Sequence, residues 1–132
     1  MAIPLQSLSG TEVLRRGCVN NQQTSGTHLK FDGTAPTTTG QSGNTVPANH
    51  IITILNIFFV EQANIANQQL HMWVTGPHSS SIYLLNSFPI AAYQTFVWRT
   101  KCSLIGGDTL IIKTNVTNSV DIWYNYIDQS WV

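Results

Sequence analysis

From Val46 onward the chain is a succession of short β-strand patterns separated by turn signals. Residues 68–75 alternate between apolar and polar side chains, and residues 50–60 are dense in β-branched and aromatic ones. No window of ten or more residues places apolar side chains at the helical spacing of three, four and seven between helix caps. The 132 residues are therefore predicted to form a single all-β domain with a core of its own.

The individual segments predict a sandwich. Residues 50–60 are apolar on both faces, which is typical of a central strand covered on both sides. Pro89 places residues 88–93 at an edge or in a turn, because proline donates no ladder hydrogen bond. Ile-Gly-Gly-Asp at 105–108 is a strong turn signal. With further strands predicted at 68–75, 82–85, 95–100, 109–114 and 120–127, the fold class is an antiparallel, jelly-roll-like β-sandwich of about seven to eight strands.

The first third of the chain differs in composition. Residues 17–49 are rich in Gly, Ser, Thr, Asn and Gln, and such a segment buries too little apolar surface to offset its ordering entropy by itself. Two short strands are predicted within this region, at 11–16 and 28–32. The sequence thus predicts an extended N-terminal arm over residues 1–44 and a sandwich domain over residues 45–132.

Charged residues are scarce. They make up 9% of the chain and sum to a net charge of zero, whereas about 25% is usual. A nearly uncharged surface favours association with other protein, and the lack of a basic stripe argues against nucleic acid as a partner. Residues 51–60 are too few to span a bilayer, and residues 1–6 (MAIPLQ) lack the features of a signal peptide. The sequence therefore predicts cytosolic synthesis and no membrane partner.

Residue patterns that support catalysis are missing from the sequence. No histidine lies two or four residues from another, and no G-x-S-x-G elbow or phosphate-binding loop occurs. Asp108 is predicted to be a turn residue. Cys18 and Cys102 belong to no metal or redox motif, and the sequence leaves open whether they pair. The prediction is a protein that is not an enzyme and has no metal and no cofactor.

Tryptophan is abundant for this length, at positions 73, 98, 123 and 131. Most such side chains fill cores, but Trp and Tyr are also enriched in interface hot spots and line sugar-binding clefts. Trp123 and Tyr124 are adjacent in one strand, so one of them must point away from the core. The apolar N-terminus adds further contact candidates. The residues predicted to contact a partner are Ile3, Leu5, Leu8, Arg15, Arg16, Trp73, Trp123 and Trp131.

Three short motifs follow one another along residues 45–127. They are TVPAN at 45–49, FPIAAYQT at 88–95 and LIGGDTL at 104–110. This string resembles the small β-sandwich structural proteins of tailed bacteriophages. The resemblance implies a virion protein made in the host cytoplasm, most simply a capsid decoration (cement) protein that binds the major capsid protein. It also implies a homo-oligomer, often a trimer. The alternatives are a tail, neck, baseplate or fibre protein, or a glycan-binding sandwich at a receptor-binding tip.

Overall fold

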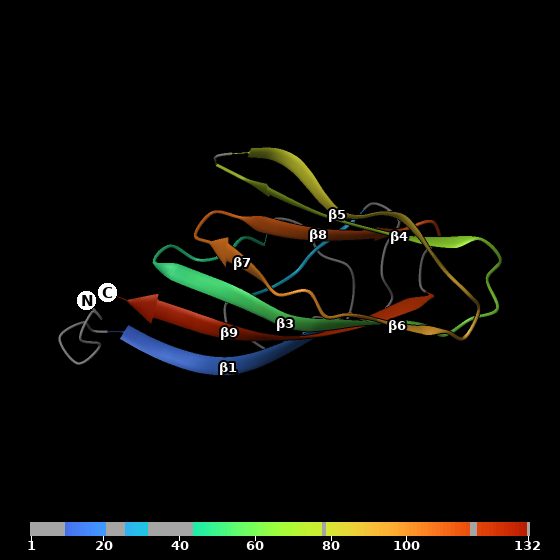
Figure 1. Cartoon of the computed structure of the whole chain (residues 1–132), viewed down its shortest axis with the longest axis horizontal. Helices are drawn as coiled ribbons and strands as arrows, with labels where there is room; N and C mark the ends of the chain where they lie inside the picture. Colours follow the sequence, from blue (N-terminus) through green and yellow to red (C-terminus); the bar gives the residue numbers. More distant parts are fainter. Residues whose placement is uncertain (1–9, 21–25, 32–43, 78, 117–118, 132) are drawn as a thin grey trace.

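The protein is a two-layered β-structure. The computed structural model describes residues 10–20, 26–31, 44–77, 79–116 and 119–131. These residues form nine strands and no helix: β1 (Gly10–Val19), β2 (Thr27–His28), β3 (His50–Glu61), β4 (Gln68–Gly76), β5 (Ser79–Ile90), β6 (Thr95–Trp98), β7 (Cys102–Ile105), β8 (Thr109–Thr114) and β9 (Val120–Trp131). Figure 1 shows the two layers edge-on. The predicted antiparallel β-sandwich is confirmed, with one or two more strands than expected. The described part of the chain holds no helix able to cross a membrane.

The strands divide into two sheets. Sheet A has the order β1-β9-β3-β6, with β7 also pairing to β3, and sheet B has the order β2-β8-β4-β5. β3 is therefore central in sheet A, as its apolar run predicts. Pro89 lies in β5, the edge strand of sheet B, which confirms its predicted edge position. The segments predicted separately at 82–85 and 88–93 are joined in this one strand as far as Ile90.

The core lies between the sheets and follows the period-two alternation of the strands. On β9 the even-numbered residues from Val120 to Tyr126 are buried, and on β4 Leu70 and Met72 face them from the other sheet. β3 changes parity, because a β-bulge shifts its register with β9 between Ile54 and Asn56. An extra residue on one strand turns the following side chains over. The buried side chains of β3 are accordingly Ile52, Ile54, Ile57, Phe59 and Glu61.

Two parts of the predicted arm belong to the sandwich. β1 pairs with β9 over its whole length, from Gly10 opposite Trp131 to Val19 opposite Ile122. β2 pairs with β8, and the core includes Leu29 and Phe31. The boundary predicted at residue 44 is thus wrong for residues 10–19 and 27–31, because a few apolar side chains within a polar segment pack on a core that the rest of the chain forms. The remainder of residues 1–44, apart from residues 20, 26 and 44, lies outside the described residues.

Candidate protein-binding surface

One face of sheet A points away from sheet B, and we call it the outer A face. It is the lower side of the lower layer in Figure 1. Directly opposite residues in antiparallel strands share a face, and Tyr124 is in the core, so its neighbour Trp123 points outward. Trp123 lies opposite Cys18 on β1 and Phe58 on β3, and Phe58 lies opposite Val97 on β6. A row of apolar side chains therefore crosses the whole sheet.

Further apolar side chains extend this row along the strands. They are Leu14, Ile51, Val60, Ile105, Ile127 and Trp131, which the strand registers place on the same face. Leu14 is 69% exposed and Trp123 is 41% exposed. The guanidinium carbon of Arg16 lies 5.6 Å from the centre of the Trp123 ring, within cation–π range. Trp123 remains partly exposed beside this contact.

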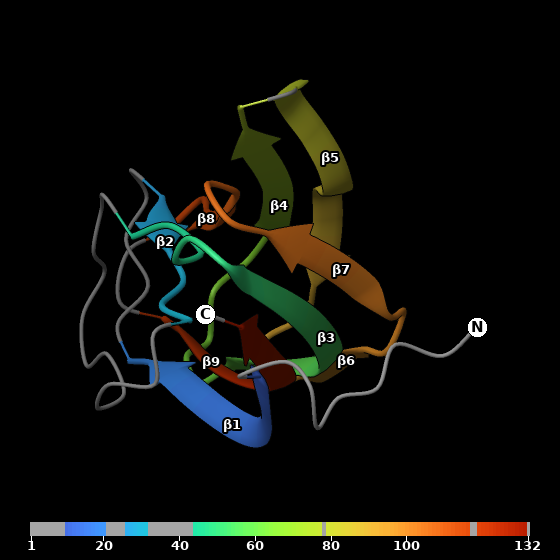
Figure 2. The same ribbon diagram turned by 90° about the vertical axis from the view of Figure 1, so that its left-hand side faces the viewer.

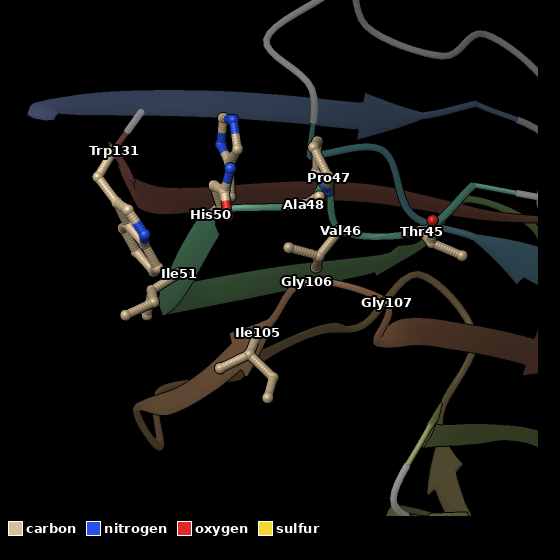
Figure 3. Close-up of a pocket in the computed structure, with 11 residues that line it drawn as sticks. Thr45, Val46, Pro47, Ala48, His50, Ile51, Ile105, Gly106, Gly107 and Trp131 are labelled. Carbon is tan, nitrogen blue, oxygen red and sulfur yellow. The ribbon is translucent and has the colours of Figure 1, made fainter. Parts of the chain in front are cut away.

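A groove continues the outer A face at the end of the sandwich where β3 starts and β7 and β9 end. Its volume is about 670 Å³, and it opens widely to solvent. Figure 3 shows Trp131 and Ile51 from sheet A at one end and the Ile105–Gly107 turn below. Exposed apolar surface comes from Trp131 and Ile105. The lining residues are Thr45, Val46, Pro47, Ala48, Asn49, His50, Ile51, Ile105, Gly106, Gly107 and Trp131.

The wall of this groove is fixed by the predicted turn at 105–108. The Asp108 carboxylate accepts one hydrogen bond from the backbone N–H of Ile105 at 2.9 Å, and Gly107 has a φ of 92°, which glycine adopts at no steric cost. The turn also holds the segment before β3 in place. The backbone N–H of Val46 donates to the Asp108 carbonyl at 2.8 Å, and the Val46 carbonyl accepts from the N–H of Gly107 at 2.9 Å. The groove is therefore preformed by backbone hydrogen bonds.

A cluster of charged and polar side chains lies behind the groove. Asp128 on β9 is 3% exposed, accepts a hydrogen bond from Arg15 Nε at 3.1 Å and lies 2.6 Å from His50 Nδ1. These residues come from β1, β9 and β3, which are adjacent in sheet A. A buried carboxylate needs such partners. The cluster thus ties the three strands together at the end of the sheet.

Within the described ranges, the His50–Asp128 pair lacks the third partner of a catalytic triad. A His–Asp pair activates a nucleophile only if the other ring nitrogen meets a hydroxyl or thiol, and His50 makes no such hydrogen bond within the described ranges. Burial raises the pKa of the Cys102 thiol and lowers the pKa of His28. Both shifts favour the neutral form. No three His, Cys, Asp or Glu side chains of the described residues are grouped to hold a metal.

The cysteines do not approach each other. Cys18 lies on the outer A face of β1, opposite Trp123. Cys102 starts β7 opposite Ile54, and its side chain packs against the core. The two thiols therefore point to opposite faces of sheet A and do not pair.

The structure separates the predicted contact residues into groups. Arg16, Trp123 and Trp131 share the outer A face. Arg15 points to the other side of the sheet and binds Asp128. Trp73 lies on the outer face of sheet B, with its ring centre 5.5 Å from that of Tyr83. The three predicted contacts near the N-terminus, Ile3, Leu5 and Leu8, lie outside the described residues.

Sequence reasoning missed His50, Asp128 and the apolar side chains of β3 and β7 on the outer A face. One signal for Asp128 was available. The alternation of β9 continues beyond residue 127, so an aspartate two residues after Tyr126 falls on the buried face. Its partners Arg15 and His50 lie far away in sequence, and only the strand registers bring them together. In comparisons with known proteins, no family model, no curated protein and no solved structure matches this chain.

Proposed function

We propose that this protein is a structural component of a bacteriophage virion, most simply a capsid decoration protein that binds and stabilises the shell of the major capsid protein. The observation that carries the binding role is the outer A face, where Trp123 and its apolar neighbours form a continuous surface that sheet B does not cover. The resemblance of residues 45–127 to phage sandwich proteins supplies the kind of partner. The role is structural and not enzymatic, and it requires no cofactor, nucleic acid or membrane.

The energetics of the outer A face favour protein as the partner. Aromatic side chains bury roughly 150–250 Å² each, at roughly 25 cal/mol per Å² of apolar area. Covering the exposed part of Trp123 is thus worth about 2 kcal/mol before the costs of association. Charged side chains on the same face are few, and Arg16 already lies over Trp123 while Asp121 accepts a hydrogen bond from Gln62. The free-energy cost of removing charged side chains from water on binding is therefore small.

A matched pair of variants tests this role. Trp123→Asp and Trp73→Asp change the same residue type on opposite faces of the sandwich. We expect Trp123→Asp to weaken binding to virions lacking the protein by about tenfold or more, as for a hot spot, and Trp73→Asp to change it little. Co-sedimentation of each purified variant with these virions measures the effect. Equal binding by Trp123→Asp and the unmodified chain would contradict the assignment of this face.

Copy number separates the decoration role from the alternative of a tail, neck, baseplate or fibre protein. A decoration protein covers a shell of repeated subunits, so quantitative mass spectrometry of purified virions is expected to count hundreds of copies. A few copies per particle would instead favour the tail or baseplate.

A second candidate function is glycan binding in the groove. The exposed face of Trp131 beside the polar residues Asn49 and His50 favours it, since sugars stack on tryptophan and bind polar side chains. Titration with a panel of oligosaccharides, followed by tryptophan fluorescence, tests it. A change that Trp131→Ala abolishes would support this function, and no change with any sugar would exclude it for that panel.

A further inference from the structure

The edge of β1 that no described strand covers, called the open edge below, is suited to pairing with a second copy of itself. β1 is the terminal strand of sheet A and pairs with β9 through ten residue pairs without a register shift. Figure 2 shows it at the outer margin of its layer, with no described strand beyond it. Its sequence, GTEVLRRGCV, contains no proline and no lysine. Proteins usually block such edges with proline, lysine, bulges or shortness.

The direction of the backbone groups on β1 follows from one hydrogen bond. Trp131 of β9 donates its N–H to the carbonyl of Asn49, next to β3. The backbone N–H and C=O groups of successive residues point to alternate sides of a strand. The backbone groups of the even residues of β9 therefore point toward β1, where they meet those of Val13, Arg15 and the other odd residues. The backbone groups of Glu12, Leu14 and Arg16 therefore point out of the open edge.

The side chains of these three residues are symmetric about Leu14. In an antiparallel pair of β1 strands centred on Leu14, each Glu12 lies opposite Arg16 of the second copy, and the two Leu14 side chains meet on the axis. A pair centred on Arg15 would instead place the two Arg15 side chains opposite each other. A pair centred on Val13 would place Glu12 opposite Leu14. Opposite charges across strands stabilise pairing and like charges oppose it. Only the Leu14-centred register satisfies both charge and apolar pairing.

We propose that two copies of this chain associate through antiparallel β1 edges in this register, and the inference does not depend on the proposed function. Sheet A then continues from one copy into the other, with both outer A faces on the same side of the joint sheet. The pairing also covers Leu14, one of the most exposed large apolar side chains described. An isologous contact of this kind gives a dimer, whereas the phage resemblance implies a trimer.

Other described edges fit less well. β2, β6 and β7 are only two to four residues long. β5 is longer, but it contains Pro89 and Ser87 with a φ of 56°, and its register with β4 shifts three times. Irregular edges of this kind resist pairing with another strand.

Charge exchange tests the register directly. Glu12→Arg and Arg16→Glu each place two like charges opposite each other at both symmetric pairs of positions 12 and 16. Each variant is therefore expected to raise the dimer dissociation constant by about tenfold or more. Mixing the two variants places opposite charges together at both positions and is expected to restore dimers as heterodimers. The double variant Glu12→Arg/Arg16→Glu is expected to dimerise like the unmodified chain. Sedimentation equilibrium of the full chain measures all four samples.

Asp121→Arg is the matched control, because it reverses a charge on the outer A face away from β1 and is expected to leave the dimer unchanged. Thermal unfolding of each variant checks that the fold is kept. An unmodified chain that stays monomeric at millimolar concentration, or that forms trimers, would overturn the proposal. Single variants that remain dimeric, or a mixture that does not re-associate, would overturn it equally.

Discussion

At the scale of single residues, Gly17 on β1 is tightly constrained by a neighbouring side chain. Tyr124 lies opposite it, with its ring buried and its hydroxyl donating to the Lys30 carbonyl at 2.7 Å and accepting from the Lys30 N–H at 3.1 Å. A Cβ atom at Gly17 would come within 2.3 Å of the Tyr124 ring carbon Cζ. Tyr124 also packs edge-on against Phe31, with ring centres 5.6 Å apart. The glycine leaves the space in which this tyrosine connects the two sheets.

Gly17→Ala is therefore expected to lower the free energy of unfolding by roughly 1–3 kcal/mol, the usual range for overpacking. Urea unfolding followed by circular dichroism measures it. In a Tyr124→Leu background the same substitution is expected to cost much less, because the conflicting ring is gone. An equal cost in both backgrounds would mean that the backbone at Gly17, and not the ring, requires glycine.

Asp128 provides the second prediction at this scale. Asp128→Ala leaves Arg15 and His50 without their acceptor and is expected to cost about 2 kcal/mol of unfolding free energy. Asp121 lies on the same strand but only bonds the exposed side chain of Gln62, so Asp121→Ala is expected to cost less than about 0.5 kcal/mol. Chemical denaturation of both variants compares them. Similar values for the two would show that the cluster does not stabilise the sheet.

At the scale of elements, β1 shows where composition misleads. The segment around it is polar on average, and only Val19 of β1 reaches the core fully. Local pattern predicted a strand at 11–16, but strand pairing with β9 involves residues more than a hundred positions away. Burial of Leu29 and Phe31 depends on the same non-local packing. A low apolar average therefore does not exclude a segment from a core that other strands have formed.

Truncation tests the role of β1 in the fold. Deleting residues 1–19 removes every hydrogen bond between β1 and β9 and exposes the core beside Val19. We expect this variant to be insoluble or to lose at least about 3 kcal/mol of unfolding free energy. Deleting residues 1–9 keeps β1 and is expected to retain the thermal unfolding temperature. If the chain without residues 1–19 still folded stably and cooperatively, residues 1–44 would be an arm outside the domain after all.

The other strands explain which elements the sequence could predict. β4 and β9 alternate cleanly, so their buried faces follow from period two. β3 does not alternate in its sequence, because its bulge reverses the parity after Ile54 and apolar residues also occupy its half-buried outer face. Its apolar run predicted cover on both sides, yet sheet B lies on one side only. The apolar residues on the side that no described strand covers are the main reason to propose a binding surface there.

At the scale of the whole molecule, the candidate site could be predicted only in part. Composition led to the prediction of aromatic contact residues, and the structure places Arg16, Trp123 and Trp131 on one face. The sequence could not place Trp73 on the opposite side of the sandwich, since sheet membership depends on pairing between distant strands. It also could not reveal the groove, which depends on backbone hydrogen bonds between the 105–108 turn and Val46.

We propose that the outer A face binds a neighbouring virion protein. Electron cryo-microscopy of the intact virion tests it most directly, by locating the chain and the surface that it buries. We predict density for this sandwich with Trp123 and Phe58 covered by a capsid subunit. A map in which the sandwich contacts its neighbours only through sheet B, with Trp123 open to solvent, would contradict this binding role.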